Sequence, residues 1–186
     1  MRLFRKALKA LALLVVIVLL ALYLYGFRPD VGKVSATVEI NRPPEQVWRY
    51  LTEDDLLKSW ISGLEEVRHV TPGPMGVGTK LALGERYGGE LTRMEMTING
   101  FEPARTIKFN IVGGDRSAAF TENGEYVLVD EDSRTRLTLS ATSVYNGFLL
   151  RLMEPYITYT AQKKVEGDLA RLKSLLEAEP RIAAPY

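Results

Sequence analysis

The chain has 186 residues, with 24 basic and 23 acidic side chains, 46% hydrophobic residues, one histidine and no cysteine. A chain of this length normally forms one compact domain, and the absence of cysteine excludes disulfides, thiol nucleophiles and thiolate metal sites. Residues 1 to 27 hold four basic and no acidic residues, which leaves 20 basic against 23 acidic residues in the remainder. This slightly acidic remainder argues against a nucleic-acid-binding surface, which needs clustered lysine and arginine.

The N-terminus predicts a single membrane-spanning helix at residues 10–27. A basic segment, residues 1–9, precedes these eighteen uncharged residues and contains Arg2, Arg5, Lys6 and Lys9. Eighteen helical residues rise about 27 Å, which is close to the thickness of the hydrocarbon core of a bilayer. A cleaved signal peptide is the alternative, but the run is longer than the usual hydrophobic region and lacks a small-residue cleavage site.

The distribution of charge also predicts an orientation. Basic residues that flank a span tend to stay in the cytoplasm, so the N-terminus is expected there and the following domain outside the cytoplasm. The inverted topology remains open. A linker at residues 28–32 would span at most roughly 20 Å when extended, so the lipid bilayer is the first expected partner of the domain.

Residues 33–179 predict one α+β domain. Residues 33–40 alternate apolar and polar side chains, as a half-buried strand does, and two short helices are expected at 41–51 and 52–61. Short turns then separate six further strands, which indicates an antiparallel meander; these strands are expected at 65–70, 79–83, 90–101, 106–112, 118–129 and 135–144. A long helix follows at 146–179, with a kink at Pro155, and residues 180–186 form a tail.

The long helix carries two apolar stripes that lie on nearly opposite sides. One consists of Val165, Leu169, Leu172 and Leu176, and the other of Leu149, Leu152, Tyr156 and Tyr159. In one interpretation, a kink or break lets both halves of the helix pack on the same sheet. In the other, the first half is a lid over a cavity or touches the membrane interface, where tyrosine is favoured.

This order of elements is the helix-grip arrangement, a curved antiparallel sheet of about seven strands around a C-terminal helix. Four segments carry a resemblance to a known family: residues 34–61 (VSATVEINRPPEQVWRYLTEDDLLKSWI), 73–80 (GPMGVGTK), 99–109 (NGFEPARTIKF) and 165–177 (VEGDLARLKSLLE). With them the chain resembles the START-like or SRPBCC superfamily, in particular its polyketide cyclase/dehydrase and lipid-transport-like branch. The resemblance implies a hydrophobic or aromatic ligand, such as a lipid, sterol, polyketide or quinone, bound between sheet and helix. Some members of the family are cyclases or dehydratases, and others are carriers or partner-binding modules.

No catalytic residue, metal site or cofactor is predicted. The only histidine, His69, lies on an expected strand without an evident nucleophile beside it. Glu90 and Glu95 are the closest approach to a carboxylate pair, but Met94 and Met96 share one face of this strand, while Arg93 and Glu95 share the other. Glu95 is therefore expected at the solvent face, unless a bulge turns it inward, and the sequence names no inward-facing carboxylate.

The predicted ligand-binding residues are apolar and aromatic side chains that face the concave side of the sheet or cover it. They are Trp60, Met94, Met96, Phe109, Tyr126, Leu139, Leu152, Tyr156 and Tyr159. The unbranched methionines suit a deformable wall, and a buried tyrosine hydroxyl could orient a polar head group. The alternative is that most of these residues are simply core.

These observations favour a membrane-anchored START-like domain that binds a hydrophobic small molecule or lipid in a cavity between the sheet and the C-terminal helix. A polyketide cyclase/dehydratase-like enzyme is the first alternative, and it needs an inward-facing pair of polar residues. The second alternative is an interaction module of a membrane complex that uses the exposed face of residues 147–159 and has a closed interior.

Overall fold

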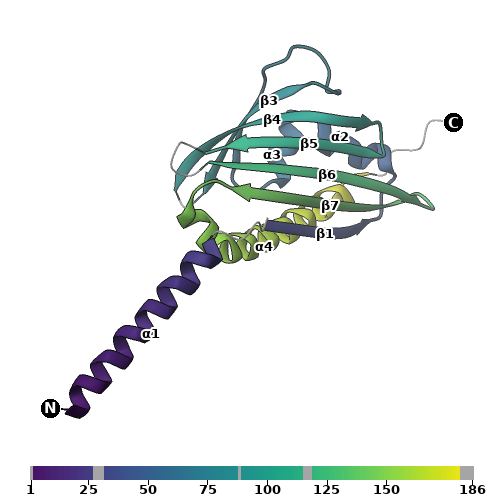
Figure 1. Ribbon diagram of the computed structural model, residues 1–186. Coiled ribbons are helices and arrows are strands. Elements are labelled where there is room, and N and C mark those ends of the chain that lie inside the picture. Colours follow the sequence, from purple (N-terminus) through teal and green to yellow (C-terminus); the bar gives the residue numbers. More distant parts are fainter. Residues whose placement is uncertain (1, 27–31, 88, 115–118, 181–186) are drawn as a thin grey trace.

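The computed structural model describes residues 2–26, 32–87, 89–114 and 119–180 (Figure 1). Its elements in chain order are α1 (Arg2–Gly26), β1 (Gly32–Ile40), α2 (Pro44–Thr52), α3 (Asp54–Trp60), β2 (Leu64–His69), β3 (Lys80–Tyr87), β4 (Glu90–Glu102), β5 (Thr106–Gly113), β6 (Phe120–Glu131), β7 (Arg134–Tyr145) and α4 (Phe148–Ala178). The predicted α+β, helix-grip arrangement is confirmed, because these residues form an antiparallel sheet of seven strands and a long C-terminal helix.

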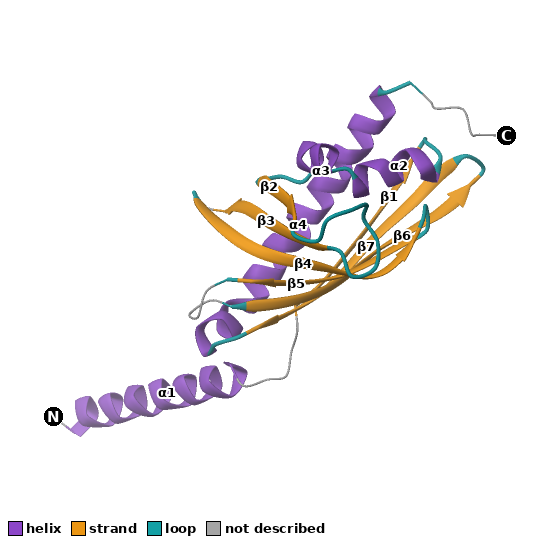
Figure 2. Cartoon of the chain, turned by 90° about the horizontal axis from the view of Figure 1, so that it is seen from above, coloured by secondary structure: helices purple, strands orange, loops and turns teal. Residues whose placement is uncertain are grey.

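The sheet has the strand order β1-β7-β6-β5-β4-β3-β2. Strands β2 to β7 form the predicted meander, in which each strand pairs with the next one along the chain, and β1 pairs with β7 at the edge. Figure 2 shows α4 running across one face of the sheet, with α2 and α3 near its C-terminal part. The apolar side chains of alternate strand positions point to this covered face, as the two-residue period of a strand requires.

The core lies between this face of the sheet and the C-terminal half of α4. Helix α4 buries Leu169, Leu172 and Leu176 there, each no more than 2% exposed. The sheet contributes a set of buried residues from its central strands: Leu81, Ile98, Ile107, Phe109, Tyr126, Leu128, Leu137 and Leu139. At roughly 1.5–3 kcal/mol for each fully buried large side chain, this contact stabilises the position of α4 more than any other feature.

Helix α4 is one continuous helix through Pro155, not two segments with different faces. Because the helix does not break, the apolar stripe in its N-terminal half stays on the outer side of the helix. The exposed fractions of Leu149, Tyr156 and Tyr159 are 66%, 66% and 63%. The interpretation in which a kink turns both halves onto the sheet is therefore wrong for these side chains.

Helix α1 extends away from the sheet as a separate rod (Figure 1). Near its C-terminal end, Tyr23 contacts Phe148 at the start of α4, with ring centroids 6.3 Å apart. Within the described part of the chain, no helix combines the length and hydropathy of a membrane span. The span predicted at residues 10–27 is therefore not confirmed; its last residue, Phe27, and most of the predicted linker lie outside the described residues.

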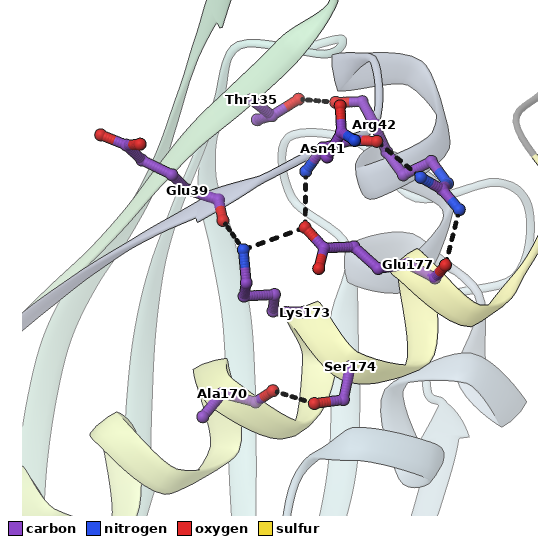
Figure 3. A network of polar contacts seen from close by, with 8 residues as sticks. All are labelled: Glu39, Asn41, Arg42, Thr135, Ala170, Lys173, Ser174 and Glu177. Atoms are coloured by element: carbon purple, nitrogen blue, oxygen red, sulfur yellow. Dashed lines mark hydrogen bonds and ion pairs between the residues drawn. The ribbon is translucent and has the colours of Figure 1, made fainter.

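A network of polar contacts joins the β1–α2 connection to the C-terminal end of α4 (Figure 3). The Arg42 guanidinium donates hydrogen bonds to the backbone carbonyls of Glu177, at 2.8 Å, and of Glu179. The backbone N–H of Asn41 donates to the Glu177 carboxylate at 2.9 Å, and the Thr135 hydroxyl donates to the Arg42 carbonyl at 2.7 Å. The two Arg42 bonds satisfy carbonyl groups that the end of a helix leaves without intrahelical partners.

A lysine on α4 completes the network from the other side. The Lys173 ammonium donates to the Glu39 carbonyl on β1 at 2.5 Å and to the Glu177 carboxylate at 2.9 Å. The hydrogen bond from the Asn41 N–H and that from Lys173 hold the pKa of Glu177 below its usual range. The C-terminal end of α4 is thus fixed to the sheet by both polar and apolar contacts.

We expect Arg42→Ala to lower the free energy of unfolding by about 1–3 kcal/mol, because charge-assisted hydrogen bonds to two carbonyls are lost. Urea denaturation of the full chain measures this change. Arg134→Ala is the matched control, since the Arg134 side chain is exposed and makes no hydrogen bond or ion pair within the described residues. Equal destabilisation by the two changes would show that the network adds nothing specific.

Candidate functional site

A small apolar cavity of about 40 Å³ lies between the sheet and the short helices α2 and α3. Met75, Met96, Phe109 and Tyr126 are among the residues that line it. A water molecule in the liquid takes up about 30 Å³, whereas pockets for small molecules measure about 300–1,000 Å³. The interior is therefore nearly filled in this conformation.

A larger open groove of about 550 Å³ lies elsewhere, at the end of the sheet where β4 turns into β5. Pro44, Glu102, Arg105 and Asp130 are among the residues around it, and it includes none of the predicted ligand-binding residues. The groove is open and largely polar, so it offers little apolar surface to a hydrophobic molecule. The smaller cavity is the better candidate because it lies inside the fold and is apolar.

Six of the nine predicted residues lie in or next to the interior. Met96, Phe109 and Tyr126 line the cavity. The remaining three, Trp60, Leu139 and Met94, belong to the core or pack against it. Trp60 is 1% exposed and donates its indole N–H to the Tyr50 carbonyl at 2.9 Å, which marks it as a structural residue.

The three predicted residues on α4 do not line the cavity. Tyr156 and Tyr159 are more than 60% exposed, and Leu152 is half-buried. The prediction failed here because it assumed that the apolar stripe in the N-terminal half of α4 faces the sheet. Whether these three residues act as a lid or contact a membrane stays a prediction.

The Phe109 ring on the cavity wall lies against Gly124. They face each other on paired strands β5 and β6, and a Cβ atom at Gly124 would lie only 2.3 Å from the Phe109 ring. The ring therefore occupies the space that a side chain at position 124 would fill. Phe109 also packs against Tyr126, with ring centroids 5.5 Å apart. A movement of this one ring would enlarge the cavity towards residue 122.

Beyond Phe109, the covered face of the sheet carries a carboxylate. Glu122 on β6 is largely buried, and its carboxylate accepts a hydrogen bond from the Ser143 hydroxyl on β7 at 2.8 Å. Burial raises the pKa of Glu122; the Ser143 hydrogen bond and the nearby Lys164 oppose this change, while the negative charge of Glu85 adds to it. A buried carboxylate with so few donors is uncommon in a purely structural position.

Lys164 on α4 lies between two further carboxylates. Its ammonium is 2.8 Å from the Asp168 carboxylate and 3.2 Å from that of Glu85 on β3. Burial disfavours the charged ammonium, but the attraction of Glu85 and the hydrogen bond and charge of Asp168 outweigh this effect, so the pKa of Lys164 is raised. Asp168 also accepts a hydrogen bond from the Ser62 N–H at 3.0 Å. We call Glu85, Glu122, Lys164 and Asp168 the interior charged cluster.

Tyr126 connects the apolar cavity with the interior charged cluster. Its side chain is 9% exposed, and burial, followed by the negative charges of Glu122, Asp168 and Glu85, raises its pKa. Within the described part of the chain, no residue forms a hydrogen bond with its hydroxyl group. A buried hydroxyl without a protein partner loses the free energy of one hydrogen bond unless a water or ligand supplies it.

The sequence prediction that no carboxylate faces inward is wrong, although the signal was present. Tyr126 was placed on the inner face, and the two-residue period puts Glu122 on that face as well. The same period places Glu85 with Leu81 and Leu83. Lys164 and Asp168 gave no such signal, because their inward position depends on how α4 rotates against the sheet.

Two other polar residues lie as expected from the sequence. Glu95 is on the solvent face of β4, where its half-exposed carboxylate is 2.7 Å from the Lys80 ammonium. His69 is an ordinary strand residue at the edge of the sheet, and its Nε2 lies 3.1 Å from the Asp54 carboxylate on α3. Neither side chain lines the apolar cavity.

Glu122→Gln should change the pH dependence of stability. Because the native pKa of Glu122 is raised above the ordinary value of 4.5, the unfolded chain loses its proton first, and stability falls as the pH rises above that value. Glutamine keeps an acceptor for Ser143 but does not titrate. We therefore expect the variant to gain stability relative to the parent as the pH increases from 4.5 to neutral, as measured by urea denaturation.

The matched control is Glu125→Gln, which removes a partly exposed carboxylate on the opposite face of the same strand. Its stability difference from the parent should vary much less with pH. A difference between parent and Glu122→Gln that stays constant over this range would contradict the raised pKa.

Comparisons with known proteins point to the same fold. The model of a family described as polyketide cyclase/dehydrase and lipid transport matches residues 31–177. No curated protein matches the sequence. Among solved structures, a conserved protein from Geobacillus kaustophilus is similar with a TM-score of 0.67 at 14% identity, covering 78% of this chain and 95% of its own.

Two further solved structures have comparable TM-scores and sequence identities. The Zhui aromatase/cyclase from Streptomyces sp. R1128 gives a TM-score of 0.64 at 18% identity, covering 80% of this chain and 94% of its own. TTHA0849 from Thermus thermophilus gives 0.58 at 22% identity, covering 78% of this chain and 97% of its own. At these identities the likeness establishes the fold alone.

Proposed function

Because the chain belongs to the polyketide cyclase/dehydrase and lipid transport family, we propose that its helix-grip domain binds a hydrophobic small molecule between the sheet and α4. The main supporting observation is the incomplete cover of the inner face. On the far side of Phe109, the side chains of Met94, Ile111 and Phe120 stay half-buried, although they belong to the face that α4 covers. Apolar surface left accessible inside a fold favours a ligand that buries it.

Binding requires the interior to expand from the cavity of about 40 Å³. Met75 and Met96 on its wall are unbranched and adapt their shape at low cost. Phe109 lies over Gly124, so a rotation of the ring opens space without moving the backbone. The N-terminal half of α4 buries only Glu154, so this half can also move more easily than the anchored C-terminal half.

The proposal is tested by extracting purified full-length protein with organic solvent and identifying any stoichiometric small molecule by mass spectrometry. Met96→Phe should lower the bound amount roughly tenfold, because the larger side chain fills the cavity. Met153→Phe is the control, as Met153 is 45% exposed on α4. A parent protein without any bound apolar molecule, and without affinity for added ones, would overturn the proposal.

We also propose that residues 10–27 hold this domain at a lipid bilayer. From Leu11 to Leu24, the large apolar side chains of α1 are 41–62% exposed, which a helix in water does not sustain without a cover. Phe148 and Met153 extend this apolar surface onto α4, next to the end of α1. The basic residues that precede the run support a cytoplasmic N-terminus and a domain on the other side of the membrane.

Membrane attachment is tested by fractionating cells after an alkaline wash. The double change Leu14→Lys and Leu20→Lys should move the protein from the membrane to the soluble fraction, because each charge costs about 2.5–3.5 kcal/mol in the middle of a span. Val77→Lys is the control, since Val77 is 69% exposed in a loop of the domain. A parent protein that is already soluble would contradict the anchor and leave ligand binding unaffected.

One specific observation supports the alternative that the protein is an enzyme. It needs an inward-facing polar pair, and Glu122 and Tyr126 are such a pair on one strand. A carboxyl group with a raised pKa is suited to donate or accept a proton. Binding remains the better-supported function, because it needs only the apolar surface that lines the cavity and no defined position of a reacting group.

A further inference from the structure

The inner face of β6 has acceptor groups that meet few hydrogen-bond donors among the described residues. In the part of the chain that the structure describes, Ser143 is the residue that donates a hydrogen bond to Glu122. A buried carboxylate has capacity for about four hydrogen bonds. Among the described residues, Glu122 therefore keeps most of its acceptor capacity at a partly buried position.

The Tyr126 hydroxyl is a second, independent indication of a missing partner. It is nine-tenths buried, lines the apolar cavity and forms no hydrogen bond with a described residue. A hydroxyl group without a described protein partner, on a side chain that is largely buried, leaves a hydrogen bond for a water molecule or a ligand. Glu122 and Tyr126 lie on the same face of β6, on either side of Gly124.

The charge of this region selects one kind of head group. Glu85 and Asp168 share the single ammonium of Lys164, and Glu122 adds a further acidic group. An anionic head group would meet repulsion in a poorly solvated space, whereas a hydrogen-bond donor would find free acceptors. Carboxylates favour donors, and a charged donor such as an amine most of all.

We propose that the bound hydrophobic molecule carries a hydrogen-bond-donating head group, an amine or an alcohol, which Glu122 and Tyr126 hold, and that anionic amphiphiles are excluded. This inference rests on the proposed ligand-binding function. The apolar body lies against Met96 and Phe109, and the ring of Phe109 moves away from Gly124 to join the cavity to Glu122. The molecule need not react, because every contact is a hydrogen bond or an apolar contact.

Three probes that share one apolar body test the inference on the full-length protein: (naphthalen-2-yl)methylamine, naphthalen-2-ylmethanol and 2-naphthoate. Isothermal titration calorimetry should show that the amine and the alcohol bind at least about tenfold more tightly than the carboxylate. In Glu122→Gln the preference for the amine over the carboxylate should fall about tenfold. Glu125→Gln, on the outer face of the same strand, should keep the parent preference.

Tyr126→Phe provides a second variant, which keeps the ring and its packing and removes only the hydroxyl group. It should weaken binding of the alcohol and leave the stability close to that of the parent. Equal or tighter binding of 2-naphthoate, or an unchanged preference in Glu122→Gln, would overturn this inference and leave the proposed function in place. If none of the probes bound, the proposed function itself would fail, and the inference with it.

Discussion

The burial of one face of the sheet, by α4 together with the short helices α2 and α3, governs the rest of the structure. Seven strands present a largely apolar face, and the apolar side chains that α4 buries against it, Leu169, Leu172 and Leu176, come from its C-terminal half. The contacts of Arg42 and Lys173 hold that half in register with β1. The N-terminal half buries no apolar side chain, although Gln162 exchanges two hydrogen bonds with the Ser35 backbone on β1, and the partly accessible interior lies under it. The same arrangement thus produces both a tightly packed core and a more accessible part of the interior.

The charged residues inside the domain follow from this division. Where the helix packs tightly, the sheet positions opposite it are leucine, isoleucine and phenylalanine. Where the cover is looser, the same strand faces carry Glu85, Glu122 and Ser143. Lys164 on the helix compensates part of this negative charge. Asp168 itself lies beside the tightly packed Leu169, where the Lys164 ammonium and the Ser62 N–H offset the cost of burying its charge.

Alternation along the strands and the turn residues between them were sufficient to predict the sheet, its antiparallel order and the long helix. The wall residues Met96, Phe109 and Tyr126 were also found, because a period of two fixes the face of each strand residue. Tyr156 and Tyr159 were misplaced, because the sequence does not show which of the two apolar stripes of α4 packs on the sheet. Glu122 was missed because a charged side chain was assumed to face solvent, although Tyr126 at an alternate position of β6 was expected to point inward.

The pairing of β1 with β7 has a consequence for how the domain forms. These two strands lie about a hundred residues apart in the chain, as the partners Val34 and Ala141 illustrate. The meander from β2 to β6 can assemble from local hairpins, but the edge strand β1 must wait until nearly the whole chain is present. During synthesis, the growing sheet has neither β7 paired with β6 at its edge nor α4 packed on its apolar face. The domain is therefore expected to fold late and as a unit, and its partly formed sheet is the state most prone to aggregation.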